Sequence, residues 1–224
     1  MGAKIGVVLS GCGFQDGAEI HESVLTLLAI ERGGAEAVCF APDIAQAQVV
    51  NHLTGETVDE TRNVLVESAR IARGAIRDVR EADPASLDAL VLPGGFGAAL
   101  NLCTFAKDGP EATVDDGVAS LVRAMHAAGK PIGAICIAPA LIAKVLGAEA
   151  PTLTIGTDEG TAGAIEACGA THRSCPVEEF VVDVDQRIVT TPAYMLGPGV
   201  KDVAAGIERC VGEVLRMIEP ATVS

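Results

Sequence analysis

The sequence has no tryptophan, one tyrosine and five phenylalanines among its 224 residues. With so few aromatic side chains it offers no stacking platform for bases or sugars, and its core has to be built from Val, Ile, Leu and Ala. Cations are also scarce, because 16 Lys and Arg stand against 30 Asp and Glu, which gives a formal net charge of -14. This charge opposes contact with nucleic acid and with anionic lipid, so neither is expected as a partner.

Long apolar runs and paired cysteines are missing as well. No segment approaches the ~18 apolar residues of a membrane span, so a soluble protein is expected. The apolar run Ile5 to Leu9, which precedes Cys12, is shorter than the ~7–15 residues of a signal-peptide core, and this argues against a lipoprotein signal. The seven cysteines are odd in number and contain no C-x-x-C pair. Such a set suits a reducing compartment, and the sequence therefore predicts a cytoplasmic protein.

What the sequence does contain is an alternation of apolar runs with segments of helical spacing, which predicts an α/β fold with a mostly parallel, doubly wound sheet and helices on both faces. The expected strands are 4–9, 37–41, 87–92, 131–135, 153–156, 180–184 and 188–191. The expected helices are 20–32, 64–73, 114–128, 137–146, 161–168 and 203–218. The last two strands alternate around Asp185-Gln186 and are interpreted as a small β-hairpin.

The length suits one domain over residues 1–224. Residues 42–63 are polar and irregular, and we interpret them as an insertion that lies on the surface or over a site. Ligands of such folds collect at the carboxyl ends of the strands. The loops after Leu9, Leu92 and Ile135 are therefore expected to form the site.

Cys136 follows the strand 131–135 directly, and helical composition resumes at the next residue. A residue held between a strand end and a helix start has to adopt a tight turn that projects its side chain from the sheet edge. The positive field of a helix N-terminus lowers the pKa of a thiol, so Cys136 is expected to be partly thiolate at neutral pH and to act as a nucleophile. The alternative is a buried cysteine that behaves as a small hydrophobe.

An attack by this thiolate on a carbonyl would need donors for the developing oxyanion. The amide of Ile137 and the amides of Gly94 and Gly95 are the candidates, because glycine lets the backbone approach closely. The alternative for Pro93-Gly94-Gly95 is a simple turn between strand and helix.

Three motifs together resemble one family. They are Ala134-Ile135-Cys136-Ile137-Ala138-Pro139, the PGGFGAALN stretch from Pro93 to Asn101, and Glu19-Ile20-His21-Glu22. The family is the PfpI superfamily, which has the class I glutamine-amidotransferase-like, flavodoxin-like fold and includes the parkinsonism-associated protein deglycase. The NHLTGE insertion, the SGCG opening and the TTPAYM stretch resemble its ElbB branch, also called isoprenoid-biosynthesis or lycopene-enhancing protein.

The resemblance implies that the cysteine is paired with a carboxylic acid from the first helix. Its position in the helix, counted back from Gly34, assigns that acid to Glu22, with Glu19 as the second choice. A glutamic acid desolvated beside a thiolate has a raised pKa, stays protonated and can shuttle a proton. The alternative for Glu22 is a carboxylate that only stabilises the helix N-terminus.

The sequence also departs from the family pattern. Ile137 stands where peptidase-like members carry histidine, and the last histidine, His172, does not begin the His-x-Glu motif of glutamine amidotransferases, so protease and glutaminase activities are disfavoured. Asp158 is a weak candidate for a third polar group and is better interpreted as a helix N-cap. Cys12 either borders the pocket, acts as a redox partner or is a small residue in a glycine turn.

The resemblance implies a cofactor-independent glyoxalase of the glyoxalase III or deglycase type, a lyase of the hydro-lyase type that converts a small aldehyde, glyoxal, to glycolate through Cys136 and Glu22. It also implies a homodimer. No metal is expected, because Cys168, His172 and Cys175 match no familiar zinc spacing and lack a fourth ligand. The alternative function, from another class, is a redox-sensing or regulatory binding protein in which Cys136 is oxidised.

Overall fold

A computed structural model describes residues 2–218 and contains a central sheet of seven strands in the order β10-β11-β7-β6-β1-β2-β5. Neighbouring strands are parallel except β10 and β11, which form an antiparallel hairpin. The strands of this sheet are β1 Lys4–Val8, β2 Glu36–Ala41, β5 Ile76–Asp78, β6 Ala89–Leu92, β7 Ile132–Ile135, β10 Val181–Asp183 and β11 Ile188–Thr191. The predicted doubly wound, mostly parallel sheet with a small hairpin is confirmed.

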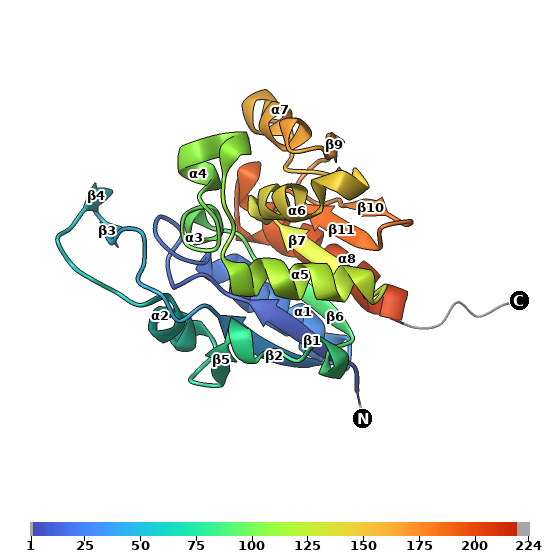
Figure 1. The fold of residues 1–224 in the computed structure, drawn as a ribbon, viewed down its shortest axis with the longest axis horizontal. Coiled ribbons are helices and arrows are strands. Elements are labelled where there is room, and N and C mark those ends of the chain that lie inside the picture. Colours follow the sequence, from blue (N-terminus) through green and yellow to red (C-terminus); the bar gives the residue numbers. More distant parts are fainter. Residues whose placement is uncertain (1, 219–224) are drawn as a thin grey trace, which may run out of the picture.

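The helices are α1 Ile20–Arg32, α2 Val64–Ile71, α3 Phe96–Leu100, α4 Phe105–Asp108, α5 Asp116–Ala127, α6 Ala138–Leu146, α7 Glu159–Ala167 and α8 Val200–Ile218. Figure 1 shows α5 and α6 in front of the sheet, with α1 and α8 behind it. The core accordingly has two parts. Leu90 and Leu92 of β6 face the layer of α5 and α6, while Ala89 and Val91 face the layer of α1 and α8. This alternation is the period of two that a strand covered on both faces requires.

Two details of the fold differ from the sequence prediction. The strand β5 was not predicted, because Ile76 is the only strongly apolar residue among its three. The strand expected at 153–156 is reduced to β8 Thr152–Leu153, which pairs with β9 Thr171–His172 outside the main sheet. In both places the segment is too short for a periodic pattern to emerge.

The insertion at 42–63 contains a small hairpin, β3 Val50–Asn51 and β4 Glu56–Thr57, at the left edge of Figure 1. It packs on the loop that joins β1 to α1: the Val50 amide donates to Asp16 Oδ2 at 2.7 Å, and the Gln15 amide donates to His52 Nε2 at 3.3 Å. The insertion thus supports the loop that leads into α1.

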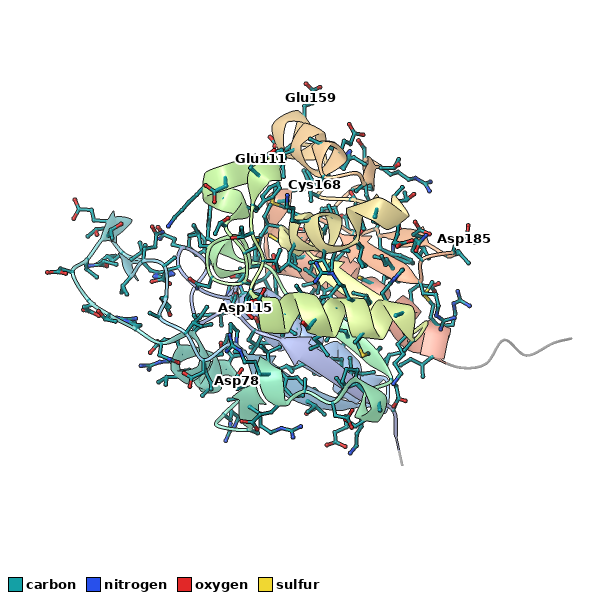
Figure 2. All side chains as sticks on the ribbon, viewed as in Figure 1. Asp78, Glu111, Asp115, Glu159, Cys168 and Asp185 are labelled. Atoms are coloured by element: carbon teal, nitrogen blue, oxygen red, sulfur yellow. The ribbon has the colours of Figure 1, made fainter. Side chains whose placement is uncertain are left out.

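Acidic side chains are spread around the molecule. Figure 2 labels Asp78 in β5, Glu159 in α7, Glu111 in a 3₁₀ turn, Asp115 before α5 and Asp185 in the turn between β10 and β11. Arg80 lies between two of them, 3.6 Å from Asp78 and 3.3 Å from Asp115. The negative charge is therefore a general property of the surface. Among residues 2–218 no helix is long and apolar enough to cross a membrane, and no group of three or more His, Cys, Asp or Glu side chains could hold a metal ion.

Helix α8 provides a test of the packing. A Cβ on Gly206 would lie 2.2 Å from the carbonyl oxygen of Val177, whereas a Cβ on Gly212 would meet nothing within 4 Å. We expect Gly206→Ala to lower the free energy of unfolding by about 1–3 kcal/mol, because backbone has to move. Gly212→Ala should raise it by about 0.5–1 kcal/mol, because alanine favours the helix. Urea unfolding of both variants measures this. Equal stability of the two variants would contradict the packing described.

Candidate active site

The tight turn expected at Cys136 is present. Cys136 lies between the end of β7 and the start of α6 with φ at 61°, in the left-handed region that residues other than glycine rarely adopt. Its amide donates to the carbonyl oxygen of Thr191 on β11 at 2.9 Å, which holds the turn against the neighbouring strand. A strained residue fixed in this way at the carboxyl edge of a sheet is typical of a functional position.

Glu22, two residues into α1, is completely buried beside Cys136, and the two side chains are within hydrogen-bonding reach. The carboxyl group accepts two backbone amides, from Gly94 to Oε2 at 2.9 Å and from Tyr194 to Oε1 at 3.2 Å. Burial raises the pKa of Glu22 to about 7, while the Tyr194 amide opposes the rise and the charge of Glu19 adds to it. This carboxyl group therefore exchanges a proton near neutral pH.

The pKa of Cys136 differs from the sequence prediction. It is raised well above the ordinary value, first by burial and then by the charge of Glu22. The amides of Gly95 and Ile137 donate to the sulfur and oppose this rise, but they do not outweigh burial. The prediction of a lowered pKa was wrong because it counted the helix N-terminus and not the desolvation of a side chain that is 7% exposed. Cys136 is a neutral thiol when the protein is at rest near neutral pH.

Gly94 lies between Cys136 and Glu22, and its lack of a side chain lets the two side chains lie close together. A Cβ at this position would lie 2.5 Å from the Cβ of Cys136 and 2.8 Å from Oε2 of Glu22, so only glycine fits. Because the Gly94 amide is bonded to Glu22, it is unavailable to an oxyanion, which corrects its expected role. Gly95, with φ at 92°, follows it and aims its amide at the sulfur together with the amide of Ile137. Those two donors remain for an oxyanion.

The three weaker candidates have structural roles or lie elsewhere. Glu19 is the N-cap of α1, where its side chain accepts the amide of Glu22 at 2.7 Å, and it also lines the cavity described below. Asp158 is exposed and caps α7 by accepting the amide of Thr161 at 2.7 Å, in agreement with the N-cap interpretation. Cys12 does not line the cavity, and its nearest charged groups are Glu67, Arg70 and Asp16.

Two functional candidates, Tyr194 and His21, were not predicted from the sequence. Tyr194 belongs to a short 3₁₀ turn, Ala193–Met195, that follows β11. Its amide bonds Glu22, and its hydroxyl lies 2.8 Å from Nδ1 of His21. The signals in the sequence were that Tyr194 is the single tyrosine and lies in the TTPAYM stretch, and that His21 lies in the Glu19-Ile20-His21-Glu22 motif.

A cavity of about 780 Å³ opens beside Cys136. Its apolar wall consists of Phe14, Gly95, Phe96, Ala99, Phe105, Ala106, Ile137 and Met195. Its polar residues are Glu19, His21, Cys136, Thr161 and Tyr194. The site has a thiol, a proton-exchanging carboxyl group and two backbone donors at one end of a largely apolar cavity, which suits addition of the thiol to a carbonyl compound.

Comparison with known proteins identifies the family. The sequence pattern of the DJ-1/PfpI family matches residues 12–191. This chain belongs to the DJ-1/PfpI family.

Close relatives of this DJ-1/PfpI protein include the human "Glutamine amidotransferase-like class 1 domain-containing protein 3, mitochondrial", which is 46% identical over 96% of this chain and 83% of its own length. The rat "ES1 protein homolog, mitochondrial" is 45% identical over 96% of this chain and 84% of its own length. A crystal structure of an isoprenoid biosynthesis protein with an amidotransferase-like domain from Ehrlichia chaffeensis is 38% identical, with a TM-score of 0.89 over 95% of this chain and 99% of that one. The predicted superfamily is confirmed.

The expected cytoplasmic location is contradicted by these relatives, because the printed names of the human and rat proteins both include "mitochondrial". The prediction rested on seven free cysteines. Unpaired cysteines indicate a reducing compartment without saying which one, so the inference was too narrow.

Two of these names include "amidotransferase-like", but the cavity of this chain has no Cys-His-Glu triad among its described residues. His172 lies on β9 and does not line the cavity. Of the described residues that line the cavity, His21 is the one histidine. The aliphatic side chain of Ile137 directly follows Cys136. Among the described residues, the cavity lining therefore contains neither His172 nor a histidine directly after Cys136.

The pKa of Glu22 gives a pH prediction. This pKa is about 7 in the native state, whereas the ordinary value is 4.5. At pH values between these two, the native state therefore binds one proton more than the unfolded state. The resulting stabilisation is complete below pH 4.5 and is lost as the pH rises through 7. We expect the free energy of unfolding of the wild type, relative to Glu22→Gln, to fall by about 3 kcal/mol from pH 4.5 to 8.

Urea unfolding of both proteins at several pH values measures the difference. Glutamine keeps only one acceptor for the amides of Gly94 and Tyr194, so the variant has a constant offset in stability and only the slope with pH is diagnostic. The Cys136 thiol does not titrate in this range, because its pKa is raised above its ordinary value of 9.0. Parallel curves for the two proteins would show that Glu22 is not the buried titrating group.

Proposed function

We propose that this protein is a cofactor-independent glyoxalase of the glyoxalase III or deglycase type, which converts glyoxal and water to glycolate. The observation that carries the proposal is the buried contact between the Glu22 carboxyl and the Cys136 thiol at the end of a cavity. A carboxyl group with a pKa near 7 can both accept and donate a proton at physiological pH, which is what an internal proton transfer requires.

The first step is addition of the thiol to one carbonyl carbon. The ionised fraction of Glu22 takes the proton of Cys136 as the sulfur–carbon bond forms, so no free thiolate has to exist beforehand. The carbonyl oxygen becomes an oxyanion beside the amides of Gly95 and Ile137, which stabilise it. Glu22 then returns the proton to this oxygen, and the product is a hemithioacetal.

The second step moves a proton between the two carbons. Glu22, again ionised, removes the hydrogen from the carbon bonded to sulfur, and the electron pair forms an enediol. Glu22 then protonates the second carbon, while the hydroxyl proton of the sulfur-bearing carbon passes to the oxygen of the second carbon, and the product is a glycolyl thioester of Cys136. One carbon is oxidised and the other is reduced, so no external oxidant or cofactor is needed. Water cleaves the thioester, which releases glycolate and restores the thiol.

The alternative function, a redox sensor based on Cys136, has less support. Oxidation by peroxide requires an accessible thiolate, and susceptibility follows thiolate character and exposure. Cys136 is 7% exposed, and its pKa is raised. General-base assistance from Glu22 explains how a neutral thiol can react with a carbonyl compound held in the cavity.

Substitution of the nucleophile tests the proposed activity. We expect Cys136→Ser to reduce kcat for glyoxal by at least about a thousandfold, because a hydroxyl is a much poorer nucleophile at this pH and does not form the thioester. Cys168→Ser is the matched control, because that thiol is partly buried at the C-terminal end of α7 and does not line the cavity. Glycolate formation by purified, metal-free protein is the measurement.

Full glyoxal turnover by Cys136→Ser would refute the assignment. A wild-type protein that shows no turnover and instead takes up one sulfinic acid at Cys136 under dilute peroxide, detected by intact mass, would favour the redox sensor.

A homodimer is a further part of the proposal. Ile20, Val24 and Leu28 recur every fourth residue along α1 and are exposed, so they form an apolar stripe on one helix face. Two copies of such a stripe can pack against each other across a twofold axis. We expect Val24→Glu to shift the protein from dimer to monomer in size-exclusion chromatography with light scattering. Leu53→Glu, in the exposed turn between β3 and β4, is the control and should remain dimeric.

A monomeric wild type would refute the dimer, and so would a Val24→Glu variant that remains dimeric at low micromolar concentration.

A further inference from the structure

The cavity beside Cys136 is much larger than glyoxal. Glyoxal consists of two carbons and two oxygens, whereas the cavity measures about 780 Å³, a volume typical of sites for much larger ligands. A reaction that involves only the thiol and the carboxyl group needs no such chamber. The remaining volume is therefore available for a substituent on the aldehyde.

The wall of the cavity shows which kind of substituent fits. The chain has only five phenylalanines, and three of them, Phe14, Phe96 and Phe105, line this cavity. Phe14 and Phe96 are 49% and 54% exposed, which leaves their rings free to contact a ligand, and Phe105 is 8% exposed. They come from the loop before α1 and from the starts of α3 and α4, so the rings converge from three separate segments. Aromatic walls of this kind bind flat apolar groups.

The charge at the cavity limits the substituent further. Of the residues between 2 and 218 that line it, none is Lys or Arg, and the one carboxylate side chain is that of Glu19. An anionic group would therefore enter without a partner, in a protein of net charge -14. The polar side chains of His21, Thr161 and Tyr194 can bind the oxygens of an uncharged carbonyl compound.

We propose that the substrate is an α-oxoaldehyde with an uncharged aromatic or other apolar substituent, which lies against Phe14, Phe96 and Phe105 while the aldehyde carbon faces Cys136. This inference rests on the proposed function for its chemistry. The steps are unchanged: the thiol adds to the aldehyde carbon, Glu22 moves the hydrogen of that carbon to the neighbouring ketone carbon, and water releases a 2-hydroxy acid. With phenylglyoxal, the product is mandelate.

Turnover of three matched compounds tests the inference. We expect kcat/KM for phenylglyoxal to exceed that for glyoxal at least about tenfold, because burial of a ring in an apolar site gives this order of discrimination. With 4-carboxyphenylglyoxal, which adds one negative charge to the same ring, kcat/KM should fall again by at least about tenfold. Formation of the 2-hydroxy acids by the wild-type protein is the measurement.

A substitution in the wall connects the preference to the cavity. We expect Phe96→Ala to reduce the ratio of kcat/KM between phenylglyoxal and glyoxal by about tenfold. Phe96 is half-exposed at the start of a short helix, so the variant should fold. Leu53→Ala is the control, because Leu53 is a large exposed apolar residue outside the cavity, and it should leave both rates unchanged.

Binding of acetophenone separates this inference from the proposed function. Acetophenone has the ring and the ketone of phenylglyoxal without the aldehyde, so it tests the cavity without turnover. If no aldehyde is converted but acetophenone binds the wild type and binds Phe96→Ala at least about fivefold more weakly, the inference that this cavity binds an uncharged aromatic carbonyl compound stands and the glyoxalase proposal fails. If glyoxal is converted but phenylglyoxal is no better and acetophenone does not bind, the substrate inference is overturned and the glyoxalase proposal stands.

Discussion

The buried contact between the Glu22 carboxyl and the Cys136 thiol is the constraint on which the rest of the site depends. Burial raises the pKa of both groups, and the charge of Glu22 raises that of Cys136 further, whereas the hydrogen bond from Cys136 lowers that of Glu22. Protein backbone therefore supplies the compensation: the amides of Gly94 and Tyr194 bond the carboxyl, and those of Gly95 and Ile137 bond the sulfur. The pair can share one negative charge, and in the proposed mechanism this charge supports attack of the sulfur on a carbonyl carbon.

This contact requires segments that are far apart in the sequence to meet within a few ångströms. Gly94 can lie between Cys136 and Glu22 only because it has no Cβ, and Gly95 approaches the backbone of Glu19 to a distance at which a Cβ would be 2.4 Å from its amide nitrogen. A parallel sheet provides the arrangement, since β1, β6 and β7 are neighbours and end at the same edge. The insertion at 42–63 packs on the loop before α1 and helps to hold it there.

The fold and half of the site could be predicted from the sequence because their causes are local. Apolar runs and helical spacing predict the strands and helices, and the absence of a loop after Ile135 predicts the strained turn at Cys136. Tyr194 was not predictable in this way, because it is 172 residues from Glu22 and meets it only through the order of the strands. The prediction that the pKa of the Cys136 thiol is lowered failed for the same reason. The helix N-terminus can be recognised in the sequence, whereas the depth of burial is a property of the assembled fold.

The raised pKa of the thiol changes how its reactivity should be understood. A cysteine that is ionised at rest reacts with any electrophile or oxidant that reaches it. In the proposed mechanism, Cys136 instead requires Glu22 to take its proton during the attack, so it reacts only with a compound held long enough for both events to occur. Residence in the cavity then becomes part of the chemistry, because binding energy from a remote substituent lowers the barrier at the reacting carbon. An apolar chamber built from scarce aromatic residues next to a thiol that is neutral at rest is consistent with an enzyme that selects its aldehyde by the substituent the aldehyde carries.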